Sequence, residues 1–342
     1  MRFVEVSPGY ATLREGPSPE LPPGSARLRV TACGVCGTDV HALHGMVLPR
    51  GATYPVHPGH EVAGIVTELH DDARGQGDVQ EGDAVVLHPL DSCGACEACR
   101  SGEEQRCGDV VTLGLHVPGG MADEIVWPVR RMVPVGDLPP TETALLADAA
   151  ATAYHALRRA ELPTGGTLCV LGAGGIGTQV LKLARALDPS VQLAAVVRSA
   201  ASAERVAGLD VHVVRELEGA HREVRKAVGP VDAVVDFTGA RGAAAGGIRM
   251  LKRGGKLVIG SVVDEPITLG TSVTGITSRE ISVVGAYVSS MDELRAVAKL
   301  ARGGAFDLSD SVSHRYPLER AVEAIRMVEE RPAGLVRLVL EP

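Results

Sequence analysis

Aromatic residues are scarce in this sequence, whose 342 residues include only three Phe, five Tyr and one Trp. The core must therefore be built from smaller aliphatic side chains, and the 41 glycines indicate many tight turns. Hydrophobic residues make up 45% and charged residues 22%, which is typical of a globular protein and excludes a disordered one. At this length we expect two domains rather than one.

Long hydrophobic runs and an excess of positive charge are also missing. No stretch approaches the roughly 18 apolar residues of a membrane helix, and the first residues, MRFVEVSPGYATLREGP, lack the apolar region of a secretory signal. The formal net charge of −8 offers no basic surface for nucleic acid or for an anionic membrane. We therefore expect a cytoplasmic protein that binds a small molecule, with its seven cysteines reduced.

The hydrophobic pattern changes its period near residue 165. Before that point, SARLRV, EVAGIVTEL and GDAVVLHP follow glycine-marked turns and predict β-strands. Beyond it, short apolar runs alternate with helical stretches; the runs are LCVLG, LAAVV, VHVV, VDAVVDF, KLVIG and ISVVGA. This alternation predicts βαβ units and a parallel sheet covered on both faces. Two more helices are expected after residue 287, the second from Pro317 to about Glu330.

A glycine-rich turn follows the first of these apolar runs. Gly172, Gly174 and Gly177 form G-x-G-x-x-G, with Gly175 and Ile176 inside the motif, after a strand and before a helix. Glycines allow the sharp turn and let backbone N–H groups and the helix N-terminus approach a pyrophosphate. The pattern predicts a dinucleotide site, and the alternative is a glycine-rich turn in an unrelated α/β domain.

The end of the second strand bears on the choice of nucleotide. An acidic residue usually stands there in a site that prefers NAD, but this chain has Val197. The next two residues are Arg198 and Ser199, which are suited to a 2′-phosphate. We favour NADP over NAD, and the alternative is that Arg198 is a solvated surface residue.

Four cysteines stand close together as C-x2-C-x2-C-x7-C: Cys93, Cys96, Cys99 and Cys107. This spacing lets four thiolates surround one ion, and a closed set of four suits a structural zinc. An iron–sulfur ligand set also begins C-x2-C-x2-C, but its fourth cysteine comes three residues later and precedes proline. Because Gly108 follows Cys107, we favour zinc.

A second group of ligand types begins at TACGVCGTDVHALHG. Cys33 and Cys36 fit a redox pair as well as half of a zinc site, so local spacing does not decide between them. His60, with Glu61 beside it, and Asp148 supply further ligands, and three protein ligands would leave one position open for an alcohol. Taken singly, each has an ordinary role, as a buried thiol, a turn histidine or a helix cap.

Together these segments resemble the zinc-dependent medium-chain dehydrogenase/reductase family of alcohol and polyol dehydrogenases. The resemblance covers nearly the whole chain, in GVCGTDVHALHG, GHEVAGIV, GDAVVLHP, CGACEACRSGEEQRC, DAAATAYHAL, LGAGGIGTQVLKLAR, VDFTGA and GLVRLVL. It implies an α/β protein with a doubly wound Rossmann sheet and a β-rich, GroES-like catalytic domain. The catalytic domain would comprise residues 1–147 and 287–342, and the dinucleotide-binding domain residues 148–286.

The resemblance also implies roles for single residues. Cys36, His60 and Asp148 look like the catalytic zinc ligands, although cysteine or glutamate more often stands at the third position. Glu61 would assist ligand exchange at the metal. The other roles are Asp39 orienting His60, Thr38 taking the alcohol proton, His41 relaying it, Thr152 contacting the nicotinamide and Arg337 contacting the pyrophosphate. Cys33 would be structural.

The implied enzyme transfers a hydride between NAD(P) and a secondary alcohol, polyol or cyclitol, with two zinc ions per chain. The polyol preference depends on the polar, histidine-rich stretch from 38 to 60. Alternatives are a zinc-free reductase of activated double bonds and a non-enzymatic dinucleotide-binding sensor. The family further implies a homodimer or homotetramer that pairs through sheet edges near ISVVGA.

Overall fold

The computed structural model divides the chain into two compact units. The first comprises Met1–Asp148 and Ser290–Pro342, and the second Ala149–Ser289. The structure describes residues 1–75, 78–263, 265–332 and 334–342. Within them, no helix is long and apolar enough to cross a bilayer.

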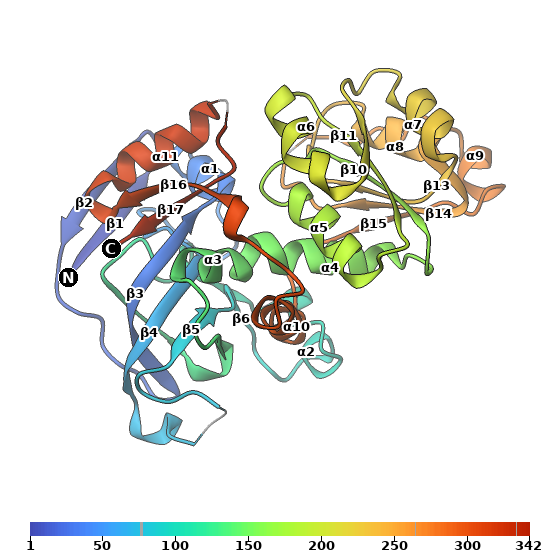
Figure 1. Cartoon of the computed structure of the whole chain (residues 1–342). Coiled ribbons are helices and arrows are strands. Elements are labelled where there is room, and N and C mark those ends of the chain that lie inside the picture. Colours follow the sequence, from blue (N-terminus) through green and yellow to red (C-terminus); the bar gives the residue numbers. More distant parts are fainter. Residues whose placement is uncertain (76–77, 264, 333) are drawn as a thin grey trace. The chain divides into compact units, whose positions relative to one another are not determined.

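The first unit is built on a seven-stranded sheet (Figure 1). Its order is β16-β17-β3-β4-β5-β9, and β8 also pairs with β3. Every pairing is antiparallel except that of β16 with β17. The strands are β3 (Ser25–Val35), β4 (Glu61–Leu69), β5 (Ala84–Leu87), β8 (Glu124–Pro128), β9 (Met132–Pro134), β16 (Val312–Pro317) and β17 (Arg337–Glu341).

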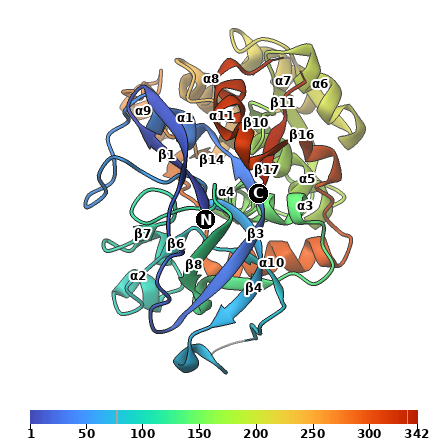
Figure 2. The same ribbon diagram turned by 90° about the vertical axis from the view of Figure 1, so that its left-hand side faces the viewer.

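Among the residues that the structure describes, this unit also contains two small sheets and five α-helices. The small sheets are β1 (Arg2–Ser7) with β2 (Tyr10–Glu15), and β6 (Leu90–Asp91) with β7 (Val111–Thr112). The helices are α1 (Gly37–Leu43), α2 (Glu97–Arg100), α3 (Pro140–Leu145), α10 (Met291–Arg302) and α11 (Ala321–Glu330). Figure 2 shows α2 beside β6 and β7, in the lobe that carries the four cysteines.

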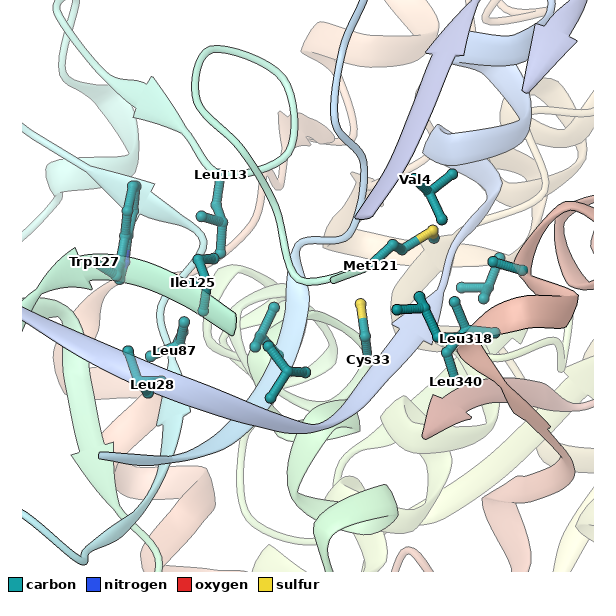
Figure 3. Close-up of a cluster of buried hydrophobic side chains, with 14 of the residues drawn as sticks. Val4, Leu28, Cys33, Leu87, Leu113, Met121, Ile125, Trp127, Leu318 and Leu340 are labelled. Atoms are coloured by element: carbon teal, nitrogen blue, oxygen red, sulfur yellow. The ribbon is translucent and has the colours of Figure 1, made fainter. Parts of the chain in front are cut away.

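The core of the first unit is aliphatic, as the shortage of aromatic residues predicts. Figure 3 shows side chains from several strands and from the C-terminal segment meeting in it, among them Leu28, Ile125, Leu318 and Leu340. The chain's one tryptophan, Trp127, is buried there and donates its indole N–H to the carbonyl of His88 at 3.0 Å.

The second unit is a six-stranded parallel sheet in the order β12-β11-β10-β13-β14-β15, which is the doubly wound order expected of a Rossmann fold. Its strands are β10 (Thr167–Leu171), β11 (Gln192–Val196), β12 (Val211–Val214), β13 (Val231–Asp236), β14 (Leu251–Ile259) and β15 (Ser282–Gly285). These positions agree with the apolar runs seen in the sequence. The predicted fold class is therefore confirmed.

Helices cover both faces of this sheet. On one face α4 (Ala151–Ala160), α5 (Gly177–Leu187) and α6 (Ala200–Val206) pack together, and on the other α7 (Ala220–Val228) packs on α8 (Ala243–Met250) (Figure 1). A short helix, α9 (Val273–Thr277), precedes the edge strand β15. The topology reverses direction between β10 and β13, so the carboxyl ends of these strands form the crevice in which such folds bind ligands.

Candidate functional site

Strand register brings two of the predicted metal ligands together. Strand β3 ends at Val35 and β4 begins at Glu61, and the antiparallel ladder pairs Gly34 with Glu61. Cys36 follows the first strand and His60 precedes the second, so both lie at the same end of the sheet. Cys36 also caps α1, where its backbone N–H donates to the carboxylate of Asp39 at 2.8 Å.

Asp148 reaches the same place from a widened helical turn. Residues Leu146–Ala150 form a π-helical turn between α3 and α4, a conformation that is rare and often found at functional sites. Its Oδ2 atom lies 3.6 Å from the Cys36 sulfur and 3.8 Å from Nε2 of His60. Three distant segments of the chain thus converge on one point.

An ion pair stands beside these three residues. β17 pairs with β3 so that Leu338 lies opposite Val35, which places Arg337 at the level of Cys36. Its Nη2 atom is 2.6 Å from Oε1 of Glu61, which is fully buried, and 3.9 Å from Oδ2 of Asp148. Arg337 therefore supplies the buried positive charge that offsets the carboxylates of this cluster.

Burial and neighbouring charges shift the pKa values in this cluster. Burial raises the pKa of Glu61 to about 7, although Arg337 opposes the shift. Burial by itself lowers the pKa of His60, but its bonds to Asp148 and Cys36 outweigh burial and hold that pKa well above the ordinary value. Burial also raises the pKa of Asp39, whose Oδ1 lies 3.9 Å from Nδ1 of His60, beyond direct hydrogen-bond distance.

The residues present fit a zinc ion. A thiol, an imidazole and carboxylates offer donor atoms that all lie within 4.8 Å of one another, and these donor types are those zinc takes in catalytic sites. Oε2 of Glu61 is buried without a hydrogen-bond partner, as expected of an atom that faces a cation. Gly34 makes room for this oxygen, because a Cβ atom there would stand 2.1 Å from it.

Two further predicted residues lie on α1 beside this cluster. The hydroxyl of Thr38 is 4.0 Å from the Cys36 sulfur, and His41 is one turn later and exposed to solvent. Residues three apart share a side of a helix, so both lie on the same side of α1. Cys33 is instead fully buried in the core (Figure 3), where burial raises the pKa of its thiol.

The four cysteines of the second cluster lie together in the lobe between β6 and β7. The sulfur of Cys99 is 3.5 Å from that of Cys96 and 3.9 Å from that of Cys93, and Cys107 joins the same group. Backbone N–H groups of Ala95 and Cys96 lower the pKa of Cys93 to about 6. Burial raises the pKa of Cys107 to about 11. These four thiols fit a closed metal site, whose cation would hold all of them as thiolates.

The glycine-rich turn has the geometry that its motif predicts. Gly172 has a φ of +88°, and a Cβ atom on Gly177 would stand 1.8 Å from the carbonyl oxygen of Gly172. The first and third glycines are thus required by the turn and by close packing of α5. A Cβ atom on Gly174 would meet no atom within 4 Å, so that position faces open space. Gly175 and Ile176 form the turn between Gly174 and Gly177 and directly precede α5.

At the adjacent strand end, the predicted Arg198 and Ser199 are both exposed and follow β11. The Ser199 hydroxyl caps α6 by accepting from the backbone N–H of Ser202 at 3.1 Å. Arg215, just after β12, donates from Nη2 to the backbone oxygen of Arg198 at 3.4 Å. Thr152 is buried in the first turn of α4.

Some structural features of these sites could not be predicted from the sequence, or were not. Arg337 was expected at a pyrophosphate, and its pairing with Glu61 depends on a strand register that joins residues 276 positions apart. The widened turn at Asp148 has no signature in LADAA. Arg215 does have a local signature, because it directly follows the parallel strand β12, whose neighbour β11 ends two residues before Arg198.

Comparison with known proteins agrees with this arrangement. Residues 22–137 match the alcohol dehydrogenase GroES-like domain, and residues 175–302 match the zinc-binding dehydrogenase family. An NAD-dependent alcohol dehydrogenase of Saccharolobus solfataricus is 30% identical over 100% of this chain and 99% of its own. An erythritol/L-threitol dehydrogenase of Mycolicibacterium smegmatis is 28% identical, over 92% and 90% of the two chains.

Solved structures give the same result. A Sinorhizobium meliloti protein, described as a zinc-binding dehydrogenase bound to NADP, has a TM-score of 0.88 and 28% identity, covering 100% of this chain and 99% of its own. An alcohol dehydrogenase of Pyrobaculum aerophilum, with cobalt and zinc bound, has a TM-score of 0.85 and 26% identity over the same shares. The chain thus belongs to the zinc-dependent medium-chain dehydrogenase/reductase family, and it is an oxidoreductase of the alcohol dehydrogenase type.

Proposed function

We propose that this protein transfers a hydride between NAD(P) and a secondary alcohol, polyol or cyclitol and the corresponding ketone. The observation that carries the proposal is the convergence of Cys36, His60 and Asp148, whose donor atoms lie within 4.8 Å of one another. Relatives named as erythritol/L-threitol and D-altritol dehydrogenases support a polyol substrate. The polar side chains of residues 38–60 suit a hydroxylated molecule better than an apolar one.

Different residues of the chain have different proposed roles in the reaction. Cys36, His60 and Asp148 would hold the ion, which as a Lewis acid lowers the pKa of an alcohol hydroxyl and polarises a carbonyl. Thr38 takes the proton of the alcohol, and His41 passes it to solvent, in which its side chain is exposed. Glu61 assists ligand exchange, with its charge offset by Arg337.

For the dinucleotide, the glycine turn and Arg198, Ser199, Thr152 and Arg337 are the proposed contacts, with a preference for NADP. Two arginines support that preference, since Arg215 contacts the backbone of Arg198. Neither guanidinium has a carboxylate partner among the residues that the structure describes. Arg198→Ala should therefore raise the Kd of NADP at least tenfold more than that of NAD, and equal losses would contradict a phosphate contact.

A screen with both nicotinamides against diols, inositols, amino-cyclitols and simple secondary alcohols tests the proposal directly. The expected result is hydride transfer to or from at least one of them by a protein that contains two zinc ions per chain. A single zinc that disappears in Cys93→Ser would favour the zinc-free reductase or the sensor. Hydride transfer to an activated double bond would then separate the reductase from the sensor.

We also propose that the chain forms a homodimer or homotetramer in the cytoplasm. Apolar side chains support an association near the edge strand β15, because Val262, Val263, Val273, Val283 and Tyr287 are all exposed. The four thiols of the lobe support a reducing compartment. Light scattering of the purified protein would measure the oligomeric state.

A further inference from the structure

A guanidinium from α6 contacts the glycine-rich turn of the second unit. Arg205 lies in the last turn of α6 and is partly buried. Its Nη1 atom donates to the backbone carbonyl of Ala173 at 2.8 Å, across 32 positions of the chain. Ala173 stands between the first two glycines of the motif, and only 2% of its surface is exposed. Arg205 is therefore bonded to the backbone of the motif itself.

This hydrogen bond fixes the direction of a neighbouring donor. The peptide bond that joins Ala173 to Gly174 is trans and planar, so its C=O and its N–H point in opposite directions. Because the carbonyl is directed at Arg205, the N–H of Gly174 points away from Arg205. Gly174 is exposed, and its N–H has no acceptor among the residues that the structure describes. This donor is thus available to a ligand.

The preceding residue of the turn is held by the two strands that flank β10. The N–H of Gly172 donates to the carbonyl of Val196 in β11 at 2.8 Å. A Cβ atom on Gly172 would stand 2.6 Å from the methyl carbon of Thr238, just after β13. The hydroxyl and the N–H of Thr238 both donate to Oδ1 of the buried Asp236, at 2.6 and 2.8 Å. Gly172 is therefore fixed by β11 and β13, and the peptide after Ala173 is oriented by α6.

Backbone N–H groups that point outward from a glycine-rich turn are the donors that bind a pyrophosphate. Their direction matters, because a hydrogen bond weakens steeply when the angle at the hydrogen departs far from linear. We propose that Arg205 is a positioning residue of the dinucleotide site, which holds the Ala173–Gly174 peptide so that the N–H of Gly174 is directed at the pyrophosphate. A cation bonded to the carbonyl also polarises this peptide and strengthens its N–H as a donor. The inference rests on the proposed dinucleotide binding.

The test measures the binding of ADP and of adenosine to the full chain by NMR titration. Arg205→Met removes the donor and keeps an unbranched side chain. It should raise the Kd of ADP about tenfold, because a hydrogen bond to a charged group is weakened. The Kd of adenosine should not change, since adenosine has no phosphate, and this also shows that the unit remains folded. Arg205→Lys keeps a cationic donor and should restore most of the affinity for ADP.

The two complete dinucleotides separate this role from that of Arg198. NAD and NADP should bind to Arg205→Met more weakly by equal factors, because both contain the pyrophosphate. Arg198→Ala should instead weaken NADP more than NAD. A loss of NADP affinity alone in Arg205→Met would show that Arg205 acts on the 2′-phosphate and would overturn the proposal.

Arg185→Met is the matched control. Arg185 lies near the end of α5 that is farther from the glycine turn, and its Nη1 atom likewise donates to backbone carbonyls, those of Pro189 and Val191, both at 2.8 Å. This variant should bind ADP as the unsubstituted chain does. Equal ADP binding by Arg205→Met and Arg185→Met, equal weakening of ADP and adenosine, or no recovery in Arg205→Lys would overturn the proposal. An unsubstituted chain that binds neither ADP nor a dinucleotide would contradict the proposed function together with this inference.

Discussion

The two clusters of ligand residues are built in opposite ways, one from a single short segment and the other from distant segments of the chain. The cysteine lobe takes four ligands from 15 consecutive residues near the surface, and backbone N–H groups stabilise the Cys93 thiolate. The cluster of Cys36, His60 and Asp148 takes its ligands from three distant segments, and its carboxylates are nearly inaccessible to water. A closed site needs only a short loop that folds around an ion, whereas an open site needs a rigid scaffold that holds fewer ligands apart.

The sharpest test of this contrast is Asp148→Ala. We expect the loss of one zinc per chain and a fall in kcat/KM of about 10³-fold or more, because Lewis-acid stabilisation of several kcal/mol disappears. The other zinc and the melting temperature should change little. Metal analysis and hydride-transfer kinetics measure both effects, and retention of full activity would show that this carboxylate is not a ligand.

Cys93→Ser should do the reverse. The lobe loses its ion, and a loss of about 3 kcal/mol in stability would lower the melting temperature by roughly 6–12 °C. The zinc held by Cys36 and His60 should remain. Calorimetry with metal analysis checks this, and an unchanged melting temperature would show that the lobe contributes nothing to the stability of the fold.

Arg337→Met probes the charge balance that only the buried cluster requires. It leaves Glu61 unpaired in the interior, which should reduce the free energy of unfolding by about 3–5 kcal/mol. Adding Glu61→Gln should recover part of this loss, because no uncompensated charge then remains on that side chain. Urea unfolding of the two variants measures the difference, and no recovery in the double variant would exclude this ion pair as the cause.

The smallest expected effect concerns thiol reactivity after zinc is removed from the lobe. With a pKa of about 6, Cys93 is mostly thiolate at pH 7, where an ordinary cysteine is only a few per cent ionised. Its alkylation by iodoacetamide should rise with pH through a midpoint near 6. Cys33 should stay unmodified because it is buried. Mass spectrometry at several pH values measures both, and a midpoint near 9 for Cys93 would contradict the stabilisation by backbone N–H groups.

The same contrast between short segments and distant segments decides which features could be predicted from the sequence. The cysteine spacing and the glycine motif are local, so residues 93–107 and 172–177 could be recognised without a fold. The six apolar runs also predicted the parallel sheet, because the inner strands of such a sheet, like β10 here, are buried on both faces. These three features depend only on residues that are close together in the sequence.

Long-range pairing could not be predicted in this way. The contact between Arg337 and Glu61 arises from the registers of β17 and β4 on β3, which no local pattern encodes. One local prediction differs only at its start, because Pro317 ends β16 in an extended conformation, and helical structure begins with a 3-10 turn at Leu318–Arg320 and continues in α11 to Glu330. Proline favours the first turn of a helix but equally suits the end of an edge strand.

The widened turn at Leu146–Ala150 has a consequence for how this protein can change. Such a turn contains one residue more than a regular helix needs, and each residue rotates the following side chains by about 100°. Deleting one alanine there would restore ordinary helical hydrogen bonding and would also turn Asp148 away from its sulfur and imidazole neighbours. A regular α-helical backbone at this position would therefore prevent Asp148 from coordinating an ion together with Cys36 and His60.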